Sequence, residues 1–343
     1  MRRKVLTLLA LAAFVLALAG MAHAAQWANP DLLLDAKQVK KHIDDPNWVV
    51  LDCRDLKDYA KGHIPGAISL GKRCKKGLRD KTSRVFDDAK YEKLFGKVGI
   101  GNDTHVVIYG EHTVTDSMKD TGVAFWILEL EGHDKAHVLN GGIDAWINAG
   151  YPLDNKPTIK AAKTFKAHRV PSRYASTDEM VAIATGKEKG VQVIDARTEK
   201  ENKGADQRAL RAGHIPHTTI NVPHKDTFDE SKDPATGKMV DNGFFSPDKV
   251  SEFYKDLDRN KRTISYCQTG TRSTLTYLHM RLLGFKDPAN YDDSWRIYGS
   301  HYSGGYPIDD EQYIDFARIK KLEKKVKKLE ESLEALAPKE EEK

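Results

Sequence analysis

The sequence predicts an α/β protein built from two tandem copies of one domain, each a parallel sheet flanked by helices, followed by a C-terminal coiled-coil helix. Three observations support this prediction: a block of residues that occurs twice, an alternation of short β-rich runs with helical patterns in each copy, and a heptad pattern near the C-terminus. The chain has 343 residues, which is comfortable for two domains.

The first 24 residues are expected to be a secretory signal rather than part of the fold. Residues 2–4 are positively charged, an apolar run follows over residues 6–18, and residues 22–24 read Ala-His-Ala, which fits a small-x-small cleavage site. The run is short for a membrane span, and no later segment is apolar enough to be one. We therefore expect an exported, periplasmic protein with no stable membrane insertion after cleavage.

The same series of blocks occurs twice along the chain. Residues 49–70 read VVLDCRDLKDYAKGHIPGAISL and residues 191–222 read VQVIDARTEKENKGADQRALRAGHIPHTTINV. Further on, HVVIYGEHTV aligns with RTISYCQTGT, and HVLNGGIDAWINAGYPLD aligns with PANYDDSWRIYGSHYSGGYPID. Because their order and approximate spacing agree, we expect a duplicated domain of about 130 residues. The copies cover residues 25–152 and 171–309, and residues 153–170 read as a linker.

The second copy shows the alternation of strands and helices most clearly. Residues 191–194 and 263–266 have the pattern of buried strands. Residues 246–257 are expected to be a helix, with Ser246 as N-cap and Pro247 at the first helical position. Residues 274–283 are expected to be a helix ending at Gly284. This alternation favours a parallel sheet covered on both faces.

Residues 310–337 are expected to form the coiled-coil helix, and residues 338–343 a charged tail. In a parallel pair Arg318 would face Glu323 of the partner, and Lys325 would face Glu330, so both pairings attract. We expect a homodimer through residues 319–336. The alternative is a terminal helix packed on its own domain, because the seam is shorter than three heptads. The seam, spaced 3-4-3-4-3, consists of Ile319, Leu322, Val326, Leu329, Leu333 and Leu336.

Charge and cysteine content narrow the function classes. The formal net charge is +5, and residues 2–4 of the expected signal carry three of the positive charges, so the mature chain gives no argument for nucleic-acid binding. The three cysteines are Cys53, Cys74 and Cys267, and an odd count leaves at least one unpaired or intermolecular in an oxidising compartment. Cys53 and Cys74 could form a disulfide or remain two small buried thiols.

Cys267 stands at the carboxyl end of a predicted strand, where open α/β sheets bind ligands. A tight loop there can aim successive backbone N–H groups at one point, and the following helix adds its positive N-terminal end. Such a site lowers the pKa of a thiol and makes the thiolate available near neutrality. Gly270 permits the backbone geometry of the loop, and Arg272 adds a positive charge. The candidate residues are the catalytic Cys267 and the loop residues Gln268, Thr269, Gly270, Thr271 and Arg272.

The length of this loop indicates which anion it holds. Cysteine phosphatases place five residues between Cys and Arg and so surround a whole phosphate. Here four residues separate Cys267 from Arg272. A smaller ring suits a single sulfur atom, in particular the outer sulfur of a persulfide.

The Asp-x-Arg strand end, the Gly-His-Ile-Pro turn, the Cys-Gln-Thr-Gly-Thr-Arg loop and the YDDSW and GYP ending together resemble the rhodanese family of sulfurtransferases. The resemblance covers about Asp31 to Asp309, and the tandem arrangement is similar to thiosulfate and mercaptopyruvate sulfurtransferases. It implies two rhodanese-like domains, of which the second is catalytic. The first has Gly110 where the second has Cys267, and is therefore expected to be non-catalytic.

The resemblance also implies a ping-pong reaction. The thiolate of Cys267 takes a sulfur from thiosulfate or a similar small donor, and passes it as a persulfide to a thiol or cyanide. The backbone amides of residues 268–272 would stabilise both charged states. Arg197 is a weaker candidate for lining the site, since it sits at a strand end that both copies share. No metal or organic cofactor is needed.

Three departures from the family pattern limit what the resemblance implies about the donor. Two-domain members often carry a substrate-binding arginine where this chain has Glu201, and many have Asp-Gly where this chain has Asp292-Asp293. The Gly-Ser-Gly-Val-Thr continuation of mercaptopyruvate enzymes is also missing after Cys267. These departures favour a thiosulfate-type donor over mercaptopyruvate.

Two kinds of residue that look catalytic in isolation have a simpler interpretation. His63 and His214 occupy the same place in both copies, although only one copy has the cysteine, so we expect them to be structural. The Asp-x-Arg pairs are expected to hold loops. His112, beside the position of the missing cysteine, is a weaker candidate for facing the cleft between the domains.

Three other functions remain open at this point. The first is a periplasmic persulfide carrier or thiol redox protein with little turnover. The second is a non-enzymatic scaffold, which the intact Cys-x4-Arg loop disfavours. The third is an oxyanion enzyme acting on phosphate or arsenate, which the short loop disfavours.

Overall fold

The computed structural model describes residues 26–111, 118–232, 234–237, 239–301 and 305–336. The expected signal at residues 1–24, His112 and the tail at residues 338–343 lie outside the described residues. Over the described part of the chain, no helix has the length and apolar character that a membrane span requires.

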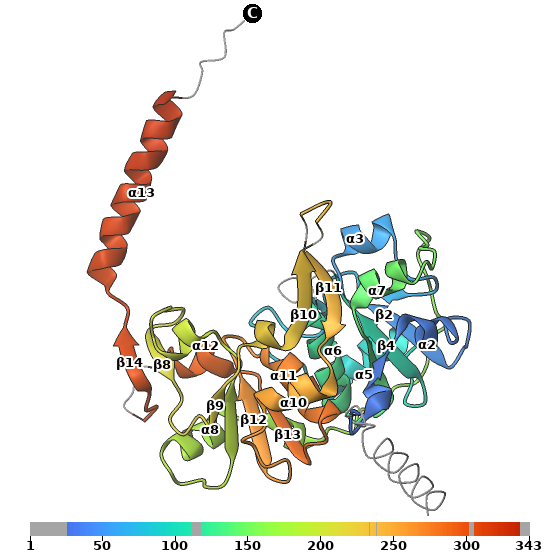
Figure 1. The fold of residues 1–343 in the computed structure, drawn as a ribbon, viewed down its shortest axis with the longest axis horizontal. Coiled ribbons are helices and arrows are strands. Elements are labelled where there is room, and N and C mark those ends of the chain that lie inside the picture. Colours follow the sequence, from blue (N-terminus) through green and yellow to red (C-terminus); the bar gives the residue numbers. More distant parts are fainter. Residues whose placement is uncertain (1–25, 112–117, 233, 238, 302–304, 337–343) are drawn as a thin grey trace, which may run out of the picture.

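Two five-stranded sheets have the same strand order, and every strand pair in them is parallel. The first sheet has the order β1-β5-β4-β2-β3, formed by β1 (Leu33–Leu34), β2 (Trp48–Asp52), β3 (Ile68–Ser69), β4 (His105–Tyr109) and β5 (Ala136–Leu139). The second has the order β6-β13-β12-β7-β9, formed by β6 (Tyr174–Ala175), β7 (Gln192–Asp195), β9 (Ile220–Asn221), β12 (Arg262–Tyr266) and β13 (Asp287–Tyr291). The predicted duplication and its parallel sheets are confirmed (Figure 1).

Helices flank both sheets. Those of the first domain are α2 (Ala36–Lys40), α3 (Leu56–Lys61), α4 (Cys74–Gly77), α5 (Asp88–Lys97), α6 (Lys119–Leu130) and α7 (Gly142–Asn148). Those of the second are α8 (Thr177–Ala184), α9 (Glu199–Asn202), α10 (Pro247–Phe253), α11 (Ser273–Leu282) and α12 (Ser294–Tyr298). Short 3-10 turns are η1 (Pro30–Leu32), η3 (Pro171–Arg173) and η4 (His224–Thr227).

The two helices predicted in the second domain are present, with one difference in length. Ser246 caps α10 by accepting a hydrogen bond from the N–H of Lys249, as expected. The helix stops at Phe253 rather than at residue 257, because Tyr254 leaves helical geometry with φ −121°. The ring of Tyr254 is buried, and its hydroxyl contacts His279 Nδ1 at 3.1 Å.

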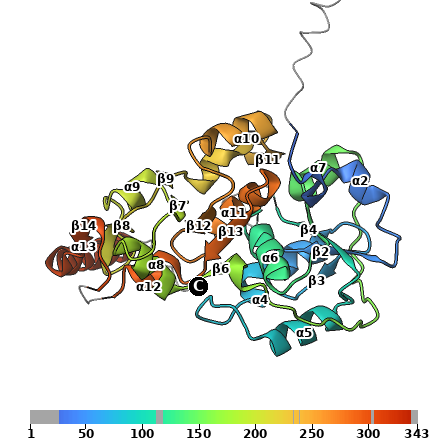
Figure 2. The same cartoon turned by 90° about the horizontal axis from the view of Figure 1, so that it is seen from below.

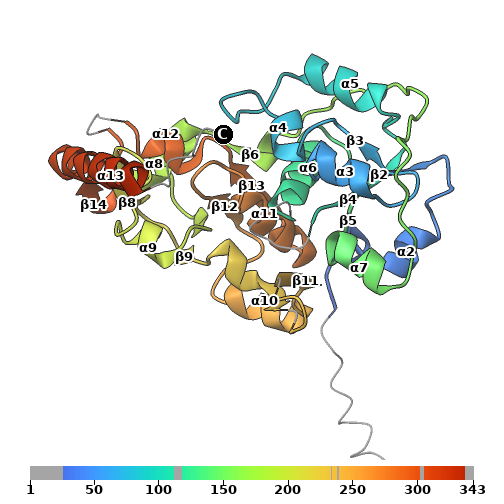
Figure 3. The same ribbon diagram turned by 90° about the horizontal axis from the view of Figure 1, so that it is seen from above.

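The two domains pack through α6 and α11, which lie side by side between the sheets (Figure 2 and Figure 3). Gly122 of α6 allows this close approach, since a Cβ there would lie 2.7 Å from Thr274 Oγ1 of α11. One apolar core runs across the boundary and includes Val123 of α6 and Leu275 of α11. A shared apolar core of this kind holds the domains in one arrangement.

A hairpin that the sequence analysis did not predict adds a second bridge between the domains. It consists of β10 (Phe228–Lys232) and β11 (Met239–Phe244), which pair in antiparallel fashion between β9 and α10 of the second domain. The N–H of Phe244 donates to Asn140 Oδ1 at 2.8 Å, and β11 packs against α7 of the first domain.

Cys53 and Cys74 form a disulfide, which decides between the two alternatives that the sequence left open. The bridge joins the end of β2 to the start of α4, and both cysteines are buried. Cys267 is the free cysteine.

The C-terminal region leaves the body of the molecule. A strand, β14 (Asp309–Tyr313), pairs antiparallel with β8 (Arg211–His214), and α13 (Phe316–Leu336) then projects outward (Figure 1). The described seam residues of α13 are exposed rather than packed on the domain. Their exposed fractions are 38% for Ile319, 51% for Leu322, 51% for Val326 and 64% for Leu329.

Candidate active site

Cys267 immediately follows β12, which lies between β7 and β13 in the second sheet. Its side chain is fully buried. Its backbone N–H and its carbonyl both form hydrogen bonds with the first two residues of α12. The N–H of Cys267 donates to Ser294 Oγ at 3.1 Å, and its carbonyl accepts from the N–H of Trp295 at 3.0 Å. The thiol therefore occupies a fixed place at the carboxyl edge of a parallel sheet, where ligand sites of such folds lie.

The loop after Cys267 turns sharply at Gly270, which has φ +67°. A Cβ on Gly270 would lie 2.4 Å from the carbonyl oxygen of Asp292, so only glycine fits without displacing the backbone. The carbonyl of Gln268 accepts from the N–H of Arg296 at 2.8 Å, and that of Thr271 accepts from Thr274 Oγ1 at 2.7 Å. These partners lie outside the loop.

The environment of Cys267 lowers the pKa of its thiol below the ordinary value. Burial by itself would raise this pKa, but it is outweighed by the charge of Arg272 and by the N–H groups of Ser273 and Thr269, which bind the sulfur. The hydroxyl of Ser273 adds a contact with Sγ at 3.6 Å. The predicted loop thus brings Cys267, Thr269 and Arg272 together as expected for an anionic sulfur.

Arg272 forms a two-point ion pair with Glu201 of α9. Its Nη1 donates to Oε2 at 2.8 Å and its Nη2 to Oε1 at 2.7 Å. Burial would raise the pKa of Glu201, but the hydrogen bonds and charge of Arg272 hold it at about 2. Thr198 also binds the carboxylate, through its N–H and its hydroxyl, both at 3.1 Å. In the sequence, Glu201 stands out only as a departure from the family pattern, and the structure places it against Arg272.

The side chains of Gln268 and Thr269 form hydrogen bonds with other parts of the second domain. Gln268 Nε2 donates to the carbonyl of Arg208 at 2.9 Å, so the loop is also tied to the segment after α9. The hydroxyl of Thr269 donates to Thr271 Oγ1 at 3.4 Å.

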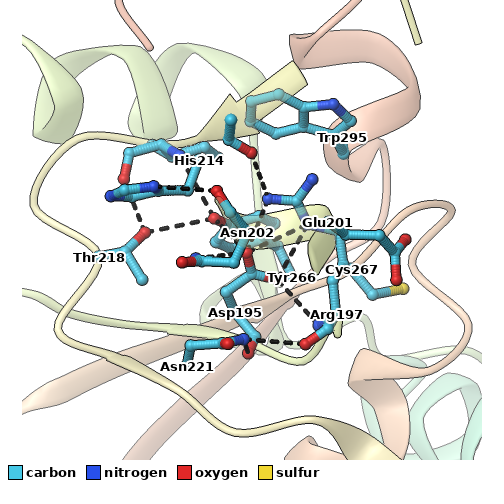
Figure 4. A network of polar contacts seen from close by, with 12 residues as sticks. Asp195, Arg197, Glu201, Asn202, His214, Thr218, Asn221, Tyr266, Cys267 and Trp295 are labelled. Carbon is cyan, nitrogen blue, oxygen red and sulfur yellow. Dashed lines mark hydrogen bonds and ion pairs between the residues drawn. The ribbon is translucent and has the colours of Figure 1, made fainter. Parts of the chain in front are cut away.

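Arg197 belongs to a buried network below the loop (Figure 4). Its guanidinium binds Asp195 at 2.7 Å and the carbonyl of Gly213 at 2.7 Å, and it lies 4.2 Å from the ring centre of Trp295. The first domain repeats this arrangement without a cysteine, since Arg54 binds Asp52 and the carbonyl of its own glycine, Gly62. These contacts support the interpretation of the Asp-x-Arg pairs as elements that hold loops. A direct contact of Arg197 with substrate stays a prediction.

The first domain has no thiol at the corresponding strand end. Gly110 follows β4, and its carbonyl accepts from the N–H of Ile143 at 3.1 Å. His63 contacts the carbonyls of Tyr59 and Lys156 through its two ring nitrogens, at 2.8 and 3.1 Å, which supports a structural role.

One residue near the site was missed by sequence reasoning. His224 begins η4 and is 7% exposed, and its N–H donates to the carbonyl of Ala196 at 3.1 Å. Burial, together with the nearby charges of Arg272 and Lys119, lowers the pKa of His224 to about 3. No local sequence signal marks this histidine, because its environment comes from segments far apart in the chain.

The model of the Rhodanese-like domain matches residues 35–149 and, a second time, residues 181–300. The chain belongs to the rhodanese family. Its first rhodanese domain carries Gly110 at the strand end where the second carries Cys267.

Relatives of this rhodanese protein have names connected with sulfur transfer. It is 32% identical over 296 residues to a Mycobacterium leprae protein named "Putative thiosulfate sulfurtransferase", covering 82% of this chain and 99% of that protein. It is 29% identical to the sulfur carrier protein TtuD of Thermus thermophilus, covering 80% of this chain and 95% of that protein. The tandem sulfurtransferase family predicted from the sequence is therefore confirmed.

A solved structure shows the same fold. SseA from Escherichia coli, described as a 3-mercaptopyruvate sulfotransferase, matches with a TM-score of 0.63 at 21% identity. The match covers 79% of this chain and 99% of that one. At this identity the likeness establishes the rhodanese fold alone.

Proposed function

We propose that the protein is an exported sulfurtransferase that moves a sulfane sulfur from thiosulfate or a similar donor to a thiol or cyanide. The observation that carries this proposal is the buried Cys267, whose pKa is lowered by Arg272 and by loop amides that bind its sulfur. Such a thiol is ionised over a wider pH range than an ordinary one, and the thiolate is the nucleophile.

The first half-reaction is a displacement at sulfur. The Cys267 thiolate attacks the outer sulfur of thiosulfate, a new S–S bond forms, and the old S–S bond breaks with its electron pair leaving on sulfite. Cys267 then carries a persulfide. The N–H groups of Thr269 and Ser273 stabilise negative charge at this place before and after the transfer.

The second half-reaction returns the cysteine to its starting state. An acceptor such as cyanide attacks the outer sulfur of the persulfide, and the electron pair of the breaking S–S bond goes back to Cys267. The products are thiocyanate and the thiolate. Over the full cycle the enzyme undergoes no net oxidation or reduction, because the persulfide formed in the first step returns to the thiolate in the second.

Export is supported by two features. One is the signal-like character of residues 2–24, and the other is the Cys53–Cys74 disulfide, which is typical of oxidising compartments.

A periplasmic persulfide carrier with little turnover is the second candidate. It is favoured by the relative named as a sulfur carrier, and by the pairing of Arg272 with Glu201, which reduces the positive charge offered to an anionic donor. The carrier and the enzyme share the Cys267 persulfide and differ in turnover.

The test is thiocyanate formation from thiosulfate and cyanide by the mature protein, together with intact-mass analysis after thiosulfate treatment. The proposed enzyme turns over many times and gains one sulfur atom on Cys267, whereas a carrier gains the sulfur but releases it slowly. Wild-type activity in Cys267→Ser would overturn the mechanism, and a protein that gains no sulfur would overturn both candidates.

A further inference from the structure

Arg79 of the first domain lies against the outside of the loop that follows Cys267. Its Nη2 donates to the carbonyl of Gly270 at 3.0 Å, and its Nη1 donates to Thr271 Oγ1 at 3.0 Å. The side chain of Arg79 has no exposed surface. A buried, two-point contact of this kind fixes both the position and the orientation of its acceptors.

The charge of Arg79 is balanced by Asp292 rather than offered to the sulfur. Nη2 of Arg79 lies 2.5 Å from Asp292 Oδ1, and the two side chains are 0% and 2% exposed. A buried charge is tolerated when it is paired, and the pair as a whole is neutral. Any influence of Arg79 on Cys267 therefore acts through the geometry of the loop.

The part of the loop that Arg79 can orient is the peptide plane between Gly270 and Thr271. The carbonyl of Gly270 accepts from Arg79 and also from Asn290 Nδ2, at 3.3 Å. In a planar trans peptide the C=O and the following N–H point in opposite directions. The N–H of Thr271 is therefore turned away from Arg79, within a loop whose neighbouring amides, of Thr269 and Ser273, bind the sulfur.

Arg79 is presented by a closed turn of the first domain. A β-bridge joins Arg79 to Val85, and the carboxylate of Asp80 accepts from the N–H groups of Thr82 and Arg84, at 2.7 and 3.0 Å. At the outer edge of the same turn, Arg84 pairs with Asp293 at 3.0 Å and is half exposed. The turn thus contacts both Asp292 and Asp293, the pair of residues at which this chain departs from the family pattern.

We propose that Arg79 is a positioning residue through which the first domain, which lacks the cysteine, fixes the Gly270–Thr271 peptide and completes the sulfur-binding loop. This inference rests on the proposed role of Cys267. It gives the non-catalytic domain a direct part in the site.

The test measures the Cys267 thiol itself and does not depend on turnover. Thiolate absorbance in the ultraviolet is followed against pH, with Cys267→Ser as the blank, since Cys267 is the free cysteine of the described chain. The main variant is Arg79→Met combined with Asp292→Asn, because removing both members leaves no unpaired buried charge. We expect the pKa of its Cys267 thiol to rise by about one unit. At a given pH below the pKa, this makes the thiolate-to-thiol ratio about tenfold smaller.

Three further variants make the result specific. Asp292→Asn alone keeps the contacts of Arg79 with the loop, so its thiol pKa should not rise. Arg84→Gln removes the exposed pair of the same turn and should leave the thiol titration unchanged. Thr271→Val removes one acceptor of Arg79 without touching a charge, and should raise the pKa by a smaller amount.

The proposal fails if the Arg79→Met, Asp292→Asn variant unfolds at the same temperature as the wild type and titrates like it. It also fails if Asp292→Asn alone raises the thiol pKa as much as the double variant. A protein that forms no persulfide with thiosulfate would contradict the proposed function, yet the thiol titration would still report whether Arg79 orders the loop.

A second, independent feature is the exposed side of α13. Its seam residues, including Leu322 and Val326, are half exposed along a helix that is otherwise charged and projects from the body (Figure 1). Single exposed apolar residues are ordinary, but a regular heptad series on one side of a helix indicates a helical partner.

We infer that α13 pairs in parallel with α13 of a second copy. In that arrangement Lys325 faces Glu330 of the other copy, whereas an antiparallel pair would bring like-charged positions together. Charge complementarity therefore selects a second copy of this chain as the partner.

Sedimentation velocity of the mature protein over a range of concentrations tests this inference. We expect a concentration-dependent dimer, which Val326→Ser should weaken at least tenfold. Lys325→Glu should weaken it as well, and adding Glu330→Lys should restore it. A wild type that stays monomeric, or a dimer unaffected by Val326→Ser, would overturn the pairing and point to another occupant of the seam.

Discussion

Arg272 donates one hydrogen bond to each carboxylate oxygen of Glu201, at 2.8 and 2.7 Å, directly beside the loop that holds Cys267. The positive charge that lowers the pKa of the Cys267 thiol is therefore matched by a buried negative charge. Figure 4 shows Glu201 and the sulfur of Cys267 on the same side of the buried network. A doubly charged donor such as thiosulfate approaches a carboxylate as well as a guanidinium, and this should limit its binding.

Replacing Glu201 by Gln should therefore improve the use of thiosulfate. Glutamine keeps the size of the side chain and one acceptor for Arg272, but it removes the negative charge that repels the donor. We expect the KM for thiosulfate to fall by roughly tenfold, which corresponds to about 1.4 kcal/mol of removed repulsion. Steady-state thiocyanate formation measures this. Glu201→Asp, which keeps the charge, is the control, and an unchanged or higher KM in Glu201→Gln would contradict the prediction.

Replacing Gly270 by Ala should disable the loop more than it destabilises the protein. The new Cβ would meet the carbonyl of Asp292, and the left-handed φ adds strain. A displacement of about 1 Å in a reacting group costs roughly a hundredfold in rate, so we expect a loss of that order in kcat/KM. Gly186→Ala is a matched control, because Gly186 has φ +71° but open space around it. Equal activity in the two variants would show that crowding at Gly270 does not matter.

Much of the fold and the centre of the site could be predicted because their signals are local in the sequence. The duplicated domain and its parallel sheets followed from two copies of one pattern of alternating strands and helices, and the loop from Cys267 to Arg272 is six consecutive residues. The hairpin of β10 and β11 could not be found in the same way, since the corresponding segment of the first copy, between β3 and α5, contains α4 instead.

The partners of the loop could not be predicted for a different reason. Arg79 contacts Gly270 and Thr271, which lie 191 and 192 positions further along the chain. Glu201 is 71 positions from Arg272. The Arg79 contacts depend on how the two domains dock, and the Glu201–Arg272 pair depends on how α9 packs against the loop within the second domain. A single sequence carries no signal for either arrangement. Two of the three departures from the family pattern, Glu201 and Asp293, were visible in the sequence, but their partners were not.

Removing the disulfide should lower stability while leaving the chemistry in place. The Cys53–Cys74 bridge spans 21 positions, and closing a loop of that size stabilises a fold by about 3 kcal/mol. We expect Cys53→Ala combined with Cys74→Ala to lose about that much free energy of unfolding in urea and to keep thiocyanate formation. Cys267→Ser is the complementary control, since it should keep the stability and lose the activity. The reverse pattern would assign the bridge a part in catalysis.

Acid should destabilise the fold through buried histidines that remain neutral in it. Burial lowers the pKa of His279 to about 3, and the pKa of His133 to about 4. An unfolded histidine titrates near 6.5, so below that pH the unfolded chain binds more protons than the folded one, and stability falls as the pH falls. Each such histidine contributes about 2 kcal/mol of this loss between pH 6.5 and pH 5. The carboxyl of Asp292 has the opposite effect on stability. Burial raises its pKa to about 6, so below that pH the folded chain binds this proton more readily than the unfolded chain does.

His279→Phe isolates one of these contributions. Its neighbours are Phe228, Phe244 and Tyr254, so a phenyl ring suits the site. The difference in free energy of unfolding between pH 7 and pH 5, measured in urea, should shrink by about 2 kcal/mol relative to the wild type. Tyr254→Phe removes the same Tyr254–His279 hydrogen bond but keeps the histidine, and should therefore retain the wild-type difference. If both variants show the wild-type difference, His279 is not the group that titrates, and the acid sensitivity must come from elsewhere in the fold.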